Sequence, residues 1–130
     1  MREIETKNAP GHTGGVVPQA VESGGWVFVS ALFGTTVEEG KIPDTPRAEA
    51  EQLFANLKAV LAAAGGTLEN VVQVTITMRA LQQDRPTFNE VWREQFGDHR
   101  PARSAIESSD FGRPGLGTRF MIQAVAHLAG

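Results

Sequence analysis

The chain has 130 residues, a formal net charge of −3 and a pI near 5.6. This length is typical of one domain with its own hydrophobic core, so we expect a single domain over residues 1–130. The acidic balance argues against a nucleic-acid binder that works by bulk charge. The chain has no cysteine, which excludes disulfides, thiolate metal sites and cysteine nucleophiles.

The amino-terminal segment does not resemble a targeting signal. Residues 1–7 mix charged with single apolar side chains, whereas a signal peptide carries a continuous apolar stretch. No apolar run approaches the roughly 20 residues that span a bilayer. We therefore expect a cytoplasmic protein that has no membrane partner.

Residues 20–30 predict a β-hairpin. Gly24 and Gly25 supply a tight-turn signal at its centre. Residues 26–30 are Trp-Val-Phe-Val-Ser, and an apolar run of this length favours a strand that is covered on both faces. Residues 20–22 are expected to pair with that strand across the turn.

Residues 46–64 predict an amphipathic helix. Asp44 or Thr45 is a candidate N-cap, and Pro46 suits the first helical turn. Gly65 is expected to end the helix with a left-handed cap. The apolar stripe at helical spacing consists of Ala50, Leu53, Phe54, Leu57, Val60, Leu61 and Ala64.

The second half of the chain predicts a strand, a helix and two more strands. Apolar and polar residues alternate over residues 72–79, which indicates a strand with one buried face. The segment 84–86 is expected to open a second helix that Gly97 ends. Residues 100–108 and 118–128 complete the prediction as strands.

The resulting order, β-β-β-α-β-α-β-β, predicts an α+β fold. Two helices cover only one face of such a sheet. We expect the other face to be apolar, with Val27, Val29 and Ala31 on one strand and Met121 and Val125 on another. An apolar face needs cover, and self-association is the simplest cover for a chain this short.

Several short segments together resemble one known family in their order and spacing. They lie at residues 15–20, 26–30, 56–61, 64–66, 71–75, 88–92, 100–104 and 122–126. The pattern covers nearly the whole chain. It resembles the RidA family, also called YjgF/YER057c/UK114 and endoribonuclease L-PSP-like.

The resemblance implies a chorismate-mutase-like fold, in which a mixed sheet carries two helices on one face. It also implies a homotrimer with clefts between its subunits. The implied reaction is that of a 2-iminobutanoate/2-iminopropanoate deaminase, which hydrolyses a reactive enamine or imine to a 2-oxo acid and ammonia. Arg103, within Arg-Pro-Ala-Arg-Ser at residues 100–104, matches the family's arginine that binds the substrate carboxylate.

Imine hydrolysis requires a held carboxylate, a water delivered to the C=N carbon, and proton transfers that release ammonia. The planar guanidinium of Arg103 suits the first task, because it binds a carboxylate through two hydrogen bonds. The resemblance implies that a glutamate on the last strand orients or activates the water, and the matching residue here is Gln123. A glutamine can orient a water but cannot accept its proton.

Four further positions match the family's pocket. Val17 and Pro18 replace the family's tyrosine and serine, and Ala31-Leu32 replaces its Gly-Gln, so we expect a more apolar pocket. Asn89 and Ala105 are the other candidate substrate-binding residues, although a helix-surface role for Asn89 is an equal alternative.

Two acids are candidates to replace the missing glutamate. Glu107 lies four residues after Arg103, and Asp110 follows in the next loop; the alternative for both is a solvated surface acid. His12, His99 and His127 show no metal-ligand spacing, so we expect no metal and no other cofactor.

Three functions remain open at this point. The first is an enamine or imine deaminase in which Arg103 holds the carboxylate and Gln123 orients water. The second is a trimer that binds small carboxylates without deaminating them. The third, an endoribonuclease, is disfavoured by the acidic charge and by the lack of a basic, aromatic surface pattern.

Overall fold

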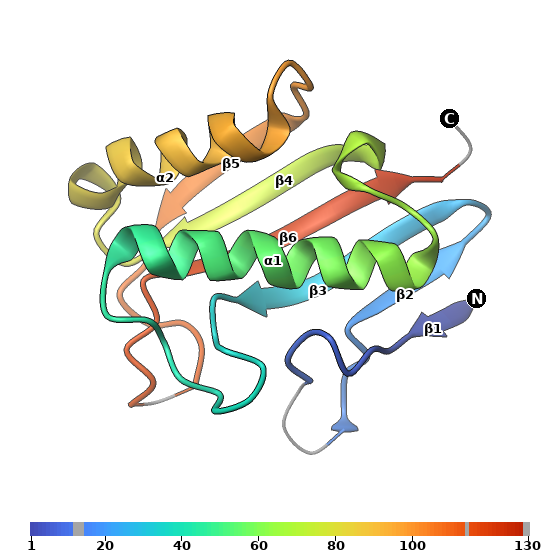
Figure 1. Ribbon diagram of the computed structural model, residues 1–130, viewed down its shortest axis with the longest axis horizontal. Helices are drawn as coiled ribbons and strands as arrows, with labels where there is room; N and C mark the ends of the chain where they lie inside the picture. The colour runs from blue at the N-terminus through green and yellow to red at the C-terminus, as the bar shows by residue number, and fades with distance from the viewer. Residues whose placement is uncertain (12–14, 114, 129–130) are drawn as a thin grey trace.

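The computed structural model describes residues 1–11, 15–113 and 115–128 and confirms the α+β order (Figure 1). No helix in these residues is long and apolar enough to cross a membrane. The elements are β1 (Arg2–Ile4), β2 (Ala20–Ser23), β3 (Trp26–Phe33), α1 (Pro46–Ala64), a 3-10 turn η2 (Leu68–Asn70), β4 (Val71–Met78), α2 (Leu81–Phe96), β5 (Ala102–Glu107) and β6 (Phe120–His127).

The strands form one sheet of six in the order β1-β2-β3-β6-β4-β5. The pair β4 and β5 is parallel and the other pairs are antiparallel. Because parallel neighbours need a crossover connection, α2 carries the chain from one end of the pair to the other. Both helices lie on the same face of the sheet (Figure 1). The edge strand β5 thus runs beside α2, and β6 lies between the two halves of the sheet.

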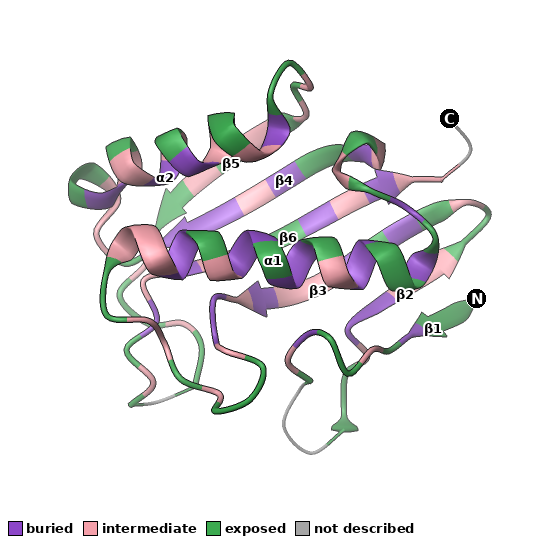
Figure 2. Cartoon of the chain, in the orientation of Figure 1, coloured by how far each residue is buried: buried purple, intermediate pink, exposed green. Residues whose placement is uncertain are grey.

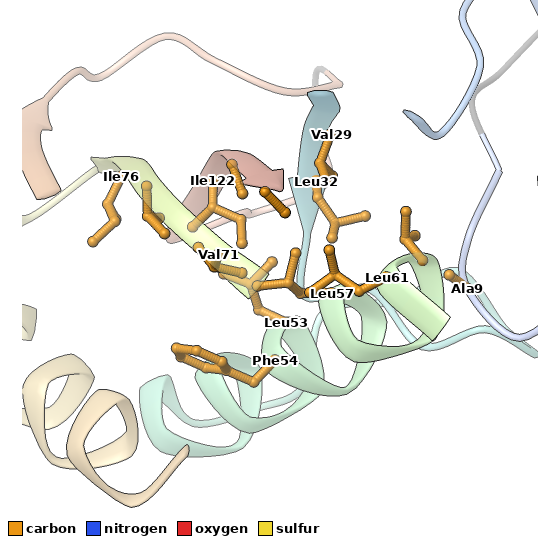
Figure 3. Close-up of a cluster of buried hydrophobic side chains, with 14 of the residues drawn as sticks. Ala9, Val29, Leu32, Leu53, Phe54, Leu57, Leu61, Val71, Ile76 and Ile122 are labelled. Carbon is orange, nitrogen blue, oxygen red and sulfur yellow. The ribbon is translucent and has the colours of Figure 1, made fainter. Parts of the chain in front are cut away.

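Helix α1 has the predicted bounds because its local signals agree. Thr45 is the N-cap and its hydroxyl accepts a hydrogen bond from the Ala48 amide, while Pro46 occupies the first turn. Gly65 ends the helix in the left-handed conformation, with φ of 93°. The buried stripe packs onto the sheet and includes Leu53, Leu57 and Leu61 (Figure 3).

Helix α2 begins at Leu81, three residues before the predicted start at Asp84. The amide of Asp84 already donates to the carbonyl of Ala80, so the first turn precedes Pro86. The side chain of Glu107, on β5, accepts a hydrogen bond from the Leu81 amide at 2.9 Å. The start was misplaced because this cap comes from a distant strand rather than from a local N-cap residue.

The prediction for the faces of β3 was wrong. Val27 and Val29 belong to the buried core beneath the helices, and a register shift between Val29 and Leu32 brings Leu32 to the same side. The open face instead carries Trp26 and Phe28, whose exposed fractions are 42% and 47%. Figure 2 shows that buried and less buried residues succeed each other along the sheet strands. The open face is therefore apolar. Met121 and Val125 of β6 lie on it as predicted, since Val125 is paired with Phe28, whereas on β3 it carries Trp26 and Phe28 instead of Val27 and Val29.

Gly34, which follows β3, lies against α1 with no space for a side chain. A Cβ at this position would sit 2.8 Å from the Glu49 Cγ and still closer to the Glu49 carbonyl oxygen. Because a backbone atom cannot move aside cheaply, we expect Gly34→Ala to lower the free energy of unfolding by about 1–3 kcal/mol in a urea titration. Gly11→Ala is the matched control, since a Cβ there would have no neighbouring atom within 4 Å, and it should leave stability nearly unchanged. Equal stability of the two variants would contradict this account.

Candidate functional site

Arg103 projects from β5 toward α2. It is paired with Val74 of β4, a core residue, so both side chains lie on the helix-covered face. Its guanidinium carbon lies 4.9 Å from the centre of the Trp92 ring and 5.7 Å from that of Phe88. These two rings follow each other by one turn on α2, so they form an aromatic support that fixes the guanidinium by cation–π contact.

The Arg103 side chain lines a cleft of about 350 Å³ between α2 and the start of β5. Among the residues that the structure describes, no acid lines it. Its lining consists of Asn89, Trp92, Arg93, Gly97, His99, Arg100 and Arg103. The cleft is therefore positively charged, in a chain whose net charge is −3.

The charge of Arg103 has no counterion within the described part of the chain. Its side chain is half-buried, and no hydrogen bond or ion pair joins its guanidinium to another described residue. Burial lowers the pKa of Arg103 below its ordinary value, and the positive charges of Arg85 and Arg93 lower it further. An anion placed in the cleft would relieve this unfavourable environment.

Asn89 contributes an unsatisfied acceptor to the same cleft. Its Oδ1 atom is buried and has no hydrogen-bond donor in the structure. Buried acceptors without a partner are uncommon in folded proteins. An N–H or O–H group of a ligand that reaches this atom would satisfy it.

One chain does not bring all the predicted site residues together. Ala105 shares the face of Arg103, since its partner is the core residue Ile76. Gln123 is paired with Thr75, the residue of β4 that follows the Arg103 partner Val74. Successive strand residues point to opposite faces, so Gln123 lies on the open face of the sheet, where it is exposed. Arg103 and Gln123 are thus on opposite faces.

Val17 and Ala31 lie farther away. Val17 is exposed in the loop before β2, and Ala31 lies on β3 and lines a separate cavity of about 150 Å³ with Leu32, Phe33 and Leu116. Two strands separate β3 from β5 in the sheet, which corresponds to about 14 Å between the strands. These two residues can contribute to the Arg103 site only from another copy of the chain.

Neither alternative acid enters the cleft. The Glu107 carboxylate accepts the hydrogen bond from Leu81 that starts α2, and Asp110 is exposed in the following loop. His99 contacts the Val71 carbonyl oxygen at 2.7 Å, and the His127 ring lies 4.4 Å from that of Trp26.

No cluster of metal ligands is present in the described ranges. A search of these residues for three or more neighbouring histidine or acidic side chains that could hold a metal ion finds none. His12 lies outside the described residues.

The basic character of the cleft was missed by the sequence analysis, which found no basic surface pattern. Arg85, Asn89 and Arg93 recur every four residues, and this spacing places them on one face of α2. That spacing was a usable signal. No local sequence pattern predicts that Arg100 lines the cleft, because its position depends on the path of the chain from the end of α2 to the start of β5.

The helix-covered mixed sheet, with an arginine at its edge that has no counterion among the described residues, defines a small α+β protein with a positively charged cleft. A family model described as endoribonuclease L-PSP matches residues 6–128, and the chain belongs to this family, the RidA/YjgF family. The 2-iminobutanoate/2-iminopropanoate deaminase of Dermatophagoides farinae is 39% identical over 106 residues, which cover 81% of each chain.

Solved structures of the family agree with this fold. The crystal structure of RidA from Psychrobacter sp. PAMC 21119 has a TM-score of 0.90 and 31% identity, and the match covers 98% of this chain and 99% of that one. The crystal structure of Escherichia coli TdcF with bound serine has a TM-score of 0.88 and 30% identity, with 98% of each chain covered.

Proposed function

We propose that this protein hydrolyses a reactive enamine or imine of a small carboxylate to a 2-oxo acid and ammonia, in the cytoplasm. The observation that carries the proposal is the half-buried guanidinium of Arg103, which is supported by two rings and lacks a counterion. The deaminase of Dermatophagoides farinae, at 39% identity, supports the same reaction class.

In this reaction Arg103 binds the carboxylate through two hydrogen bonds and thereby fixes the adjacent C=N carbon. The Oδ1 atom of Asn89 accepts the N–H of the imine, which satisfies its missing hydrogen bond. A water oxygen adds to the carbon and its protons move to the nitrogen. The C–N bond then breaks, so that one water and one imine give one 2-oxo acid and one ammonia.

The proposal includes a homotrimer, because Gln123 cannot reach the Arg103 cleft of its own chain. Gln123 would orient the water from a neighbouring copy. The apolar open face supports this association, since Trp26 and Phe28 remain about half exposed in a single chain. A monomer in sedimentation at micromolar concentration would contradict this part of the proposal.

A second function, carboxylate binding without deamination, is favoured by one observation. No carboxylate lines the Arg103 cleft, and Gln123 cannot accept a proton from water. A protein with this site would bind a 2-oxo acid reversibly and leave imines unchanged.

Ammonia release from an imine made in situ by an amino-acid oxidase separates the two functions. We expect the wild type to accelerate release. Gln123→Glu should accelerate it by a further factor of about 10–100, since a carboxylate adds general-base catalysis. Acceleration only by Gln123→Glu would support the binding function, and saturable 2-oxo acid binding should then be seen in calorimetry. If neither protein accelerates release and neither binds a 2-oxo acid, both functions are wrong.

A further inference from the structure

The Arg103 cleft holds more positive charge than one carboxylate can neutralise. Arg93 and Arg100 line it together with Arg103. The positive charge of Arg85 is also close enough to lower the pKa of Arg103. The lining has no acidic residue. A monocarboxylate bound to Arg103 would therefore leave two lining arginines without a counterion.

Three arginines outside the cleft are paired with acids. Arg47 contacts Glu94 and two further glutamates, Arg119 contacts Glu49, and Arg2 contacts Glu22. In contrast, the side chains of the cleft arginines form no ion pair within the described residues. The cleft thus gathers three arginines without acidic partners in a protein whose net charge is −3.

Burial separates the cleft arginines into two positions. Arg103 is half-buried on its two aromatic rings, whereas Arg93 and Arg100 are exposed. Arg93 lies one turn after Asn89 on α2, and Arg100 lies three residues before Arg103. The cleft therefore has an inner positive site, formed by Arg103, and an outer positive site at its rim, formed by Arg93 and Arg100. Asn89, whose Oδ1 atom lacks a donor, lines the same cleft.

We propose that the ligand of this cleft is a dicarboxylate, the 2-imino derivative of an acidic amino acid. Its α-carboxylate binds Arg103, its imine N–H faces Asn89, and its second carboxylate binds at the rim between Arg93 and Arg100. This inference rests on the proposed function and names its substrate class. The reaction that supplies such a substrate is the two-electron oxidation of an acidic amino acid at its α-carbon.

Calorimetric titration with two stable 2-oxo acids tests the inference without requiring turnover. 2-Oxoglutarate and 2-oxopentanoate share a five-carbon skeleton and differ only in a terminal carboxylate or methyl group. We expect 2-oxoglutarate to bind about tenfold more tightly at low ionic strength, because the second carboxylate gains charge-assisted hydrogen bonds. Added salt should reduce this preference, since the rim arginines are exposed.

Variants of the two rim arginines test whether they cause the preference for 2-oxoglutarate. Arg93→Gln and Arg100→Gln should each lower 2-oxoglutarate affinity several-fold and 2-oxopentanoate affinity by a smaller factor, so that the preference for the dicarboxylate decreases. Lys7→Gln removes one charge from an exposed residue of the amino-terminal segment and should change neither. Equal affinities of the wild type for the two acids would overturn the dicarboxylate inference and leave the deaminase proposal standing. Absence of binding by both acids, together with no ammonia release from either imine, would overturn the proposed function itself.

Discussion

Replacing Arg103 with glutamine is expected to lower 2-oxo acid affinity and the kcat/KM of ammonia release by about 100-fold or more. The variant loses two charge-assisted hydrogen bonds to the carboxylate, each worth about 1.5–3 kcal/mol. Arg103→Lys should recover only part of the loss, because an ammonium keeps the charge but not the planar fork. Calorimetry and the coupled oxidase assay measure the two quantities.

Thermal unfolding distinguishes a binding role of Arg103 from a structural one. The guanidinium is partly desolvated, is repelled by Arg85 and Arg93, and has no counterion among the described residues. Removing it should leave the melting temperature unchanged or raise it, despite the loss of the contacts with Trp92 and Phe88. A variant that unfolds more easily but still binds 2-oxo acids normally would show that Arg103 serves the fold and not the ligand.

Replacing Glu49 with alanine is expected to have the largest effect on stability, a loss of about 3–5 kcal/mol. Glu49 is fully buried at the start of α1. Its carboxylate accepts hydrogen bonds from the backbone amides of Arg119 and Phe120 and from the Arg119 side chain at 2.8–3.1 Å. Alanine would leave all three donors without this partner. Glu49→Gln keeps one acceptor oxygen and should cost clearly less, and urea titrations measure both losses.

The same residue predicts a pH dependence. Burial raises the pKa of Glu49 above its ordinary value, and the hydrogen bonds from Arg119 offset this only in part. In the folded state the Glu49 carboxyl therefore keeps its proton at pH values at which the same carboxyl has lost its proton in the unfolded state. The stability that Glu49 contributes is complete below the unfolded pKa and declines as the pH rises through the folded pKa. Relative to Glu49→Gln, the wild type should thus lose stability from about pH 4 upward. A difference between the two that does not change with pH would contradict this.

The parts of the fold that depend on local signals were predictable. Thr45, Pro46 and Gly65 determine the bounds of α1 through hydrogen bonds and backbone angles within a few residues. The faces of β3 were not predictable, because a run that is apolar at every position has no period that distinguishes its sides. Its orientation is set by pairing with β6, far along the chain, and by the register shift before Leu32.

The sequence predicted individual residues of the candidate site but not their arrangement. The segment around Arg103 matches the family's carboxylate-binding arginine and Gln123 departs from the family's glutamate, and the roles of both stay predictions. Their placement on opposite faces follows from the register of β5 and β6 against β4, which no local pattern contains. The convergence of Arg93 and Arg100 on Arg103 likewise depends on the tertiary path of α2.

The position of β6 has a consequence for synthesis of the protein on the ribosome. This strand lies between β3 and β4, yet it follows every other strand in the chain. A nascent chain that has emerged only as far as Ser109 lacks the strand that joins β1-β2-β3 to β4-β5. The six-stranded sheet can form only after β6 emerges, and until then the edges of β3 and β4 that pair with β6 are open to chaperones and to neighbouring nascent chains.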